Sequence, residues 1–199
     1  MKPTTPLTVL ALASPALSAF LGLEFAYSIL ARHIDHHHPT HPGLEIDTTL
    51  TAADSHIWAN KDGAAACPPE ANVSCAAALN TTTFVFSRKT NTARLNVAHP
   101  GGQQLYVDAE GAVRYTPVDN SVLLASVQTR HLKRRLHDGL RTWLCSEGKE
   151  EDGEEQAFKL YLTEKPAMRP MVEDEGRICV RTDLHFQRLK KGPTAWQFD

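Results

Sequence analysis

The fold is decided by the stretch Pro100-Gly101-Gly102-Gln103-Gln104-Leu105-Tyr106-Val107-Asp108-Ala109-Glu110-Gly111-Ala112-Val113-Arg114-Tyr115-Thr116. In it, Leu105 and Val107 fall on one face of an extended chain and Tyr106 falls on the other. Residues 113–115 alternate in the same way, and this period of two is typical of half-buried strands. Between the two runs, residues 108–111 begin with a turn former and end with glycine. The stretch therefore predicts a β-hairpin with a type I turn and a left-handed glycine.

Two other segments resemble this hairpin. In the hairpin and in both of these segments, an aromatic residue is followed by glycine five positions later; the aromatic residues are Trp58, Tyr106 and Trp143. Recurrence of one supersecondary unit indicates an internal repeat. The spacing is unequal, so the pattern is either a decayed threefold symmetry or a chance recurrence of common strand and turn residues.

Further alternating runs, among them residues 23–29, 44–51, 83–86 and 158–162, bring the expected total to about ten to twelve short strands. Residues 127–140 depart from this pattern, with leucines four positions apart that suit a short amphipathic helix. Many short strands with turns between them predict an all-β domain. Three hairpin-centred units favour a β-trefoil, and a β-sandwich is the alternative.

Composition and the amino terminus bear on location. The chain has 199 residues, of which 42% are hydrophobic and 22% charged, with a formal net charge of -2. This suits one globular domain and gives no basic field for nucleic acid or an anionic membrane. Residues 1–18 combine Lys2, a short apolar run and small residues, which predicts a secretory signal peptide cut after Ser18. The apolar run is too short to span a bilayer comfortably. We therefore expect a secreted domain at 19–199.

The four cysteines agree with export. Disulfides are the default in a secreted chain, and of the three possible pairings we expect Cys67–Cys75 and Cys145–Cys179. Neither pair has the tight spacing that favours zinc. Asn72 and Asn80 each begin an Asn-x-Ser/Thr sequon and are the predicted glycosylation sites.

Residues 33–43 form a loop that holds five of the ten histidines. His36, His38 and His41 are the candidate metal ligands, because clustered imidazoles bind transition metals. Adventitious affinity is the favoured interpretation, since no nearby residue completes a defined site, and no cofactor is expected. The sequence also carries no hydrolase elbow, P-loop, zinc-protease or dinucleotide motif, so we do not expect an enzyme.

The central stretch, residues 100–113, resembles the fungal IgE-binding and phialide cell-wall protein family, which carries a similar PGGQQ-hydrophobic-YV core. The same register accommodates the cysteines around it and the ending Ala195-Trp196-Gln197-Phe198. The resemblance implies a small, secreted, non-enzymatic protein associated with the fungal cell wall, and it supplies no catalytic residues.

Two functions follow as hypotheses. A monomer could bind wall polysaccharide through Trp58, Tyr106 and Trp143, although large aromatic residues more often pack in a core. Alternatively, loops 66–80 and 149–155 could recognise another extracellular protein, as loops on a rigid scaffold often do.

Overall fold

The structure is a computed structural model that describes residues 24–33, 47–67, 82–87, 92–99, 102–118, 141–147, 156–163, 177–190, 195 and 197–198. These residues contain no helix, and therefore none long and apolar enough to cross a membrane. The predicted signal peptide, both sequons, Cys75 and the helix expected at 127–140 lie outside this part. The same holds for the candidate recognition loop at 149–155 and for residues 68–80 of the loop at 66–80. The histidine-rich loop lies outside it as well, apart from His33, which ends the first strand instead of starting the loop.

The described residues form thirteen strands, so the all-β prediction is confirmed. In chain order they are β1 (Glu24–His33), β2 (Asp47–Thr49), β3 (Thr51–Ala53), β4 (His56–Ala59), β5 (Ala65–Ala66), β6 (Phe84–Ser87), β7 (Thr92–Leu95), β8 (Leu105–Val107), β9 (Val113–Tyr115), β10 (Arg141–Ser146), β11 (Phe158–Thr163), β12 (Cys179–Leu189) and β13 (Gln197–Phe198).

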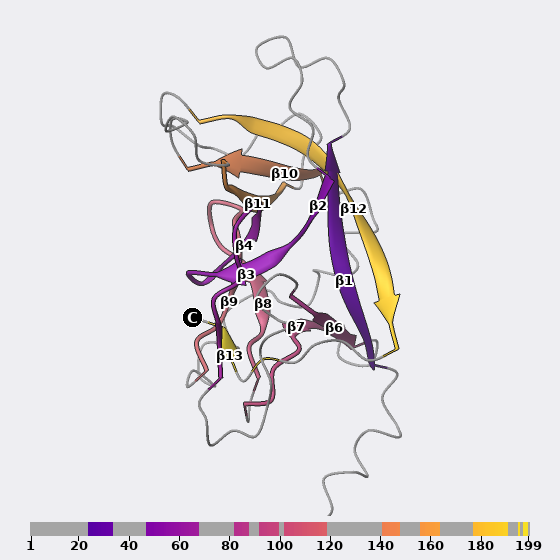
Figure 1. The fold of residues 1–199 in the computed structure, drawn as a ribbon. Coiled ribbons are helices and arrows are strands. Elements are labelled where there is room, and N and C mark those ends of the chain that lie inside the picture. Colours follow the sequence, from indigo (N-terminus) through magenta and orange to yellow (C-terminus); the bar gives the residue numbers. More distant parts are fainter. Residues whose placement is uncertain are drawn as a thin grey trace, which may run out of the picture.

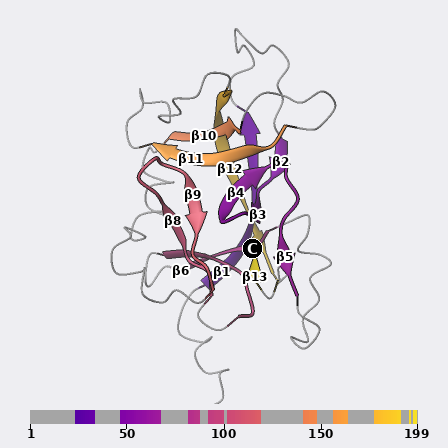
Figure 2. The ribbon, with the colours of Figure 1, turned by 90° about the vertical axis from the view of Figure 1, so that its left-hand side faces the viewer.

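Eleven of these strands form one large sheet in which all named strands pair antiparallel (Figures 1 and 2). Its main path runs β7-β6-β1-β12-β10-β11-β4-β9-β8, with β2 beside β1 and β3 beside β4. The two ends of the path meet, because Arg94 forms an antiparallel bridge with Gln104 and the Leu95 amide donates to the Gln103 carbonyl over 2.9 Å. The sheet therefore closes on itself. This strand order confirms neither the trefoil nor the sandwich arrangement.

The predicted hairpin is confirmed as β8 and β9. Tyr106 lies opposite Arg114, and the Asp108 side chain caps the turn by accepting from the amides of Glu110 and Ala112. Gly111 has a φ of +93°, the left-handed conformation that the turn requires. The Gly111 carbonyl also accepts from the Leu162 amide over 2.8 Å, so the turn is attached to β11.

Aliphatic and aromatic side chains fill the inside of the closed sheet. Alternation in the strands sends every second residue inward, which explains the buried Ile57 of β4, Leu105 of β8 and Leu144 of β10. Among them lies a cavity of about 20 Å³, lined entirely by apolar residues. It has room for roughly one water molecule.

Cys145 of β10 lies directly opposite Cys179 of β12, and the two form the predicted disulfide with their Cα atoms 4.1 Å apart. It closes a long loop, since the cysteines are 34 residues apart. Cys67 is also disulfide-bonded. Because Cys75 lies outside the described residues, the pairing of Cys67 with Cys75 stays a prediction.

We expect Gly111→Ala to destabilise the fold by roughly 1–3 kcal/mol, because the residue keeps a positive φ and a Cβ there would lie 2.9 Å from the Leu162 carbonyl oxygen. Gly102→Ala is the matched control: its φ is +65°, but the nearest atom to its Cβ would be 4.0 Å away. Urea unfolding of both variants measures the difference. Equal losses of stability would show that the close approach to β11 contributes nothing.

Candidate functional site

The three aromatic residues singled out in the sequence share the outer face of the closed sheet. Trp58 of β4 lies between the buried Ile57 and Ala59, so its side chain points outward. The same alternation sends Tyr106 of β8 and Trp143 of β10 to the outside. The structure thus brings together residues that lie far apart in the sequence, on strands β8, β4 and β10.

Basic side chains stand between these aromatic residues. Arg114 of β9 lies opposite Tyr106 on one side and His56 on the other, and Lys159 of β11 lies opposite Trp58. Tyr161, the next outward residue of β11, lies opposite Trp143. We call this surface the aromatic–cationic face, defined by Trp58, Tyr106, Trp143, Tyr161, Lys61, Arg114 and Lys159.

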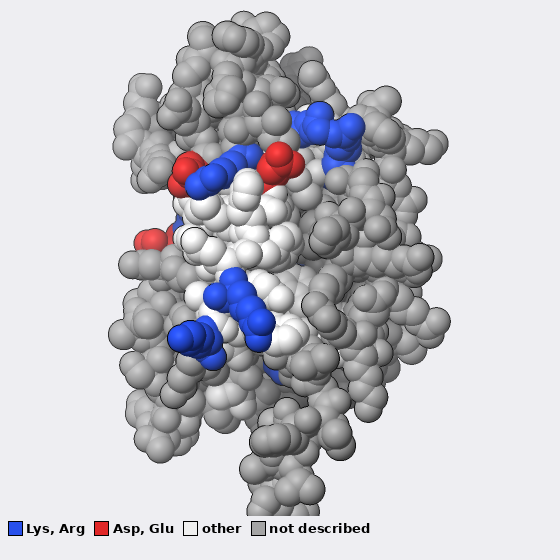
Figure 3. Space-filling model, turned by 90° about the vertical axis from the view of Figure 1, so that its right-hand side faces the viewer, with Lys and Arg blue, Asp and Glu red and all other residues white. Residues whose placement is uncertain are grey.

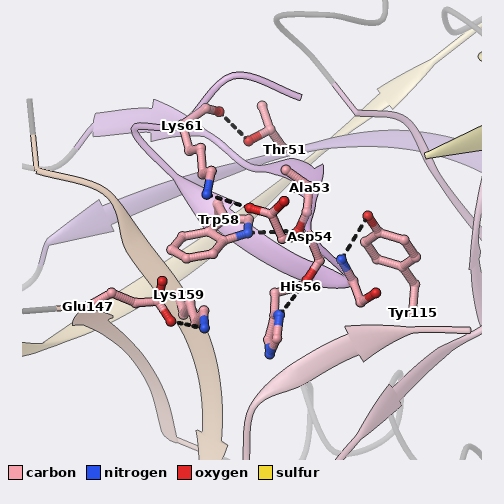
Figure 4. A network of polar contacts seen from close by, with 10 residues as sticks. Thr51, Ala53, Asp54, His56, Trp58, Lys61, Tyr115, Glu147 and Lys159 are labelled. Carbon is pink, nitrogen blue, oxygen red and sulfur yellow. Dashed lines mark hydrogen bonds and ion pairs between the residues drawn. The ribbon is translucent and has the colours of Figure 1, made fainter. Parts of the chain in front are cut away.

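Trp58 is packed rather than presented to solvent. Only 2% of it is exposed, and its indole N–H donates to the Ala53 carbonyl over 2.8 Å. Two ammonium groups lie over the ring, that of Lys61 at 4.0 Å and that of Lys159 at 4.9 Å from the ring centroid (Figure 4). Such cation–π contacts each contribute about 0.5–1 kcal/mol, and more where water is excluded. Trp58 is therefore a support under the two lysines.

Carboxylates keep these lysines in place. Lys61 pairs with Asp54 at 2.5 Å, and Lys159 pairs with Glu147 (Figure 4). Asp54 and Ser55 both have positive φ, which suits the tight turn between β3 and β4. The Ser55 amide donates to the Tyr115 hydroxyl over 3.1 Å, so the turn is anchored to β9. The position of the Lys61 ammonium thus depends on a turn that three strands share.

Burial and repulsion between cations shift the pKa values of groups in this cluster. Burial, followed by the nearby charges of Arg177, Lys61 and Arg114, lowers the pKa of Lys159, although Asp54 opposes the change. Burial also lowers the pKa of His56, with Lys159 and Arg114 acting in the same direction. Burial raises the pKa of Tyr161. The face is thus a region where positive charge is costly and each cation depends on a neighbouring carboxylate.

Tyr106 and Trp143 remain half-buried. The indole N–H of Trp143 donates to the Thr163 hydroxyl over 3.2 Å. Tyr161 packs with Ala112 and the Cys145–Cys179 disulfide in a small second hydrophobic cluster on this outer side of the sheet. Of the three aromatic residues predicted to bind, Tyr106 and Trp143 are those with a partly exposed surface.

A second concave region lies at one end of the sheet. It is a cavity of about 310 Å³ lined by Ser55, His99, Gln103, Tyr115, Pro117, Val118, Gln197 and Phe198. Gln103 is 1% exposed, and its amide group pairs with the main chain of Phe198, donating to the carbonyl and accepting from the N–H, each over 2.8 Å. The central motif and the chain's last residues therefore meet in one place. Sequence reasoning did not find this contact.

His36, His38, His41, Asn72 and Asn80 lie outside the described residues, so the structure gives them no geometry. Within the described part, no three His, Cys, Asp or Glu side chains come together as they would around a metal ion. Sequence reasoning also missed Lys61, Arg114 and Lys159. Their outward positions follow from strand alternation, but their proximity depends on strand pairings that a single sequence does not show.

Comparison with known protein families, with curated proteins and with solved structures finds no match for this chain. The resemblance to the fungal cell-wall family therefore rests on the residues of the central motif and the ending.

Gln103→Leu should destabilise the fold by about 2–4 kcal/mol, because it leaves the Phe198 N–H and C=O without their partner in a buried site. We expect faster hydrogen exchange at the Phe198 amide as well. Gln104→Leu is the control, since the Gln104 side chain makes no hydrogen bond with the described residues. If both variants exchange at the same rate at Phe198, the side-chain pairing does not hold β13.

The lowered pKa of His56 predicts a specific pH dependence of stability. Between the folded pKa and the ordinary value of 6.5, the unfolded chain binds more protons, so stability is complete above pH 6.5 and falls as the pH drops below it. His56→Gln should flatten this part of the curve. Thermal unfolding of both proteins between roughly pH 5 and 8 measures it, and parallel curves would contradict the expectation.

Proposed function

We propose that this chain is a secreted, non-enzymatic protein of the fungal cell wall that binds wall polysaccharide through the aromatic–cationic face. The observation that carries the proposal is the placement of Tyr106 and Trp143 on one outer surface of the sheet. They lie at either side of Trp58, whose ring packs under Lys61 and Lys159. Tyrosine and tryptophan suit this role because each combines a large apolar ring with a polar group that can meet a hydroxyl.

The filled interior supports an outer surface as the binding region. The cavity of about 20 Å³ among the described core residues is too small for a sugar ring. Binding outside, along several strands, suits an extended polymer better than a small molecule enclosed in a pocket. The 310 Å³ cavity beside Gln103 is concave, but its lining already satisfies the amide of Gln103 with Phe198.

The charges favour a neutral polysaccharide. Lys61 is paired with Asp54, Lys159 with Glu147, and Arg114 lies 3.8 Å from Asp108. Each of these three cations thus has a carboxylate beside it, which reduces the positive field that an acidic polymer would meet there. Chitin and β-glucan, which are neutral or nearly so, are therefore the substrates to test, and we expect their binding to depend weakly on salt.

The resemblance to the fungal cell-wall family supports the location. The residues that carry it, 100–113 and the ending, meet at Gln103 and Phe198 in the structure. The predicted signal peptide at 1–18 and the disulfides agree with export. The internal threefold repeat stays a prediction, and the proposal does not depend on it.

Trp143→Ala and Tyr106→Ala should each weaken retention on chitin or β-glucan by roughly five- to tenfold, because each removes aromatic contact area from the binding surface. His185→Ala is the matched control, since His185 is an exposed ring on the part of β12 that pairs with β1 and not with β10. Affinity electrophoresis in gels containing each polymer measures the effect. No retention of the unaltered protein on either polymer would remove the glycan-binding proposal.

A further inference from the structure

The cavity of about 310 Å³ beside Gln103 takes no part in the polysaccharide binding proposed above. Its lining comes from four segments that lie far apart in the sequence: the turn between β3 and β4, the connection from β7 to β8, the end of β9 and strand β13. Pockets that hold small molecules have volumes of roughly 300–1,000 Å³. A volume at the lower end of this range suits a small molecule better than an extended polymer.

Three lining residues are almost fully buried and form the base of the cavity. Gln103, Tyr115 and Phe198 are each no more than 3% exposed. The side-chain amide of Gln103 is engaged with the main chain of Phe198 through both of its polar groups. The base is therefore held in place without a ligand, and the polar contacts to a ligand come from the other lining residues.

The part of the lining that Ser55 contributes is fixed to β9. The Ser55 amide donates to the Tyr115 hydroxyl over 3.1 Å (Figure 4), and the Tyr115 amide donates to the Ser55 carbonyl over 3.2 Å. Asp54 and Ser55 both have positive φ, as a tight turn between two strands requires. Because the position of Ser55 is set before a ligand arrives, binding loses little conformational entropy there.

Hydrogen bonds also hold the segments that carry Pro117 and His99. The Thr116 amide, next to Pro117, donates to the Gln104 carbonyl over 2.9 Å. The turn that begins at His99 is closed by the Gly102 amide, which donates to the His99 carbonyl over 3.1 Å. The cavity is thus built into the fold, as is usual for small-molecule sites.

The lining carries polar groups but no Asp, Glu, Lys or Arg. Its partly exposed polar residues are Ser55, His99 and Gln197. Figure 3 shows where charged side chains of described residues lie on the side of β1 and β12, above and below an uncharged area. A charged ligand in the cavity would lose water without meeting an opposite charge, which is costly. Hydroxyl, imidazole and amide groups instead suit a ligand with neutral donors and acceptors.

Apolar surface lies beside these polar groups. Pro117 is exposed and Val118 is half-buried, and the rings of Tyr115 and Phe198 line the base. The Ser55 hydroxyl makes no hydrogen bond with the described residues, so it can bind a ligand without giving up a partner among them. A sugar ring has the matching chemistry, because hydroxyl groups surround its apolar C–H faces, and small-molecule sites combine apolar contact with a few polar groups that fix orientation.

From these observations we propose that the cavity beside Gln103 binds a small uncharged molecule with several hydroxyl groups, the size of about one or two sugar rings. Ser55, His99 and Gln197 hydrogen-bond to its hydroxyl groups, while the apolar lining residues pack against its carbon atoms. A free sugar and the end of a polysaccharide chain have this same chemistry. The site shares no residue with the aromatic–cationic face, and the proposal does not depend on that face.

Titration of the full chain with glucose and with N-acetylglucosamine, followed by amide NMR shifts, tests the proposal. We expect shifts at Ser55, His99, Val118 and Gln197, with a dissociation constant on the order of millimolar, as suits a ligand with few heavy atoms. Glucuronate and glucosamine, which carry a charge on a similar ring, should bind at least about threefold more weakly. Tighter binding of chitobiose than of N-acetylglucosamine would identify the chain end as the source, and equal binding a free sugar.

Variants separate this site from the aromatic–cationic face. Val118→Trp should weaken sugar binding at least about tenfold, because the larger side chain fills the cavity. Ser55→Ala should weaken it about three- to tenfold, since it removes one hydrogen bond and keeps the main-chain bonds to Tyr115. Tyr106→Ala is the matched control, which should leave the sugar titration unchanged.

The unaltered protein alone can contradict the proposal, whatever the variants do. Absence of shifts at the lining amides at about ten times the expected dissociation constant would overturn it. So would shifts centred on Tyr106 and Trp143 instead of the cavity, or sugar binding that Val118→Trp leaves unchanged.

Discussion

The closure of the sheet depends on Gln103. Its main-chain carbonyl accepts from Leu95 and so joins the two ends of the strand path, while its side-chain amide pairs with the main chain of Phe198. One buried residue thus forms hydrogen bonds with the main chains of β7 and β13, which lie far apart in the sequence. Because unpaired main-chain groups are costly in a dry interior, replacing the Gln103 side chain leaves the N–H and C=O of Phe198 without their partners, whereas the main-chain bond from Leu95 stays. The preceding Gly102, with its positive φ, provides the bend that lets Gln103 reach both.

The part of the fold that is local in sequence could be predicted. The hairpin of β8 and β9 follows from alternation and turn chemistry, and the disulfide of Cys145 with Cys179 agrees with the pairing expected for a secreted chain. Residues 179–189 form one continuous strand, β12, which no glycine or proline interrupts. The run at 44–51 is instead divided into β2 and β3 at Leu50.

The closure of the large sheet and the aromatic–cationic face could not be predicted from such local patterns. Strand β1 pairs with β12 through Ala26 and Leu189, which lie more than a hundred and fifty positions apart. Alternation shows which side chains face the same way along a strand but not which strands are neighbours. Aromatic content identified Trp58 as a candidate, yet the lysines that cover its ring come from a turn and from β11. Which side chains of different strands lie close together depends on the order of the strands in the sheet.

The filled interior has an evolutionary consequence. Since inward side chains are occupied with packing, substitutions at those positions are constrained by volume, while partly exposed neighbours in the chain are not. Along β7 and β9, where burial alternates, tolerance to substitution should therefore rise and fall at every second residue. Such a protein can diversify what its outside recognises while its inside stays the same, and relatives descended from it would keep the inward half of each strand and lose the outward half first.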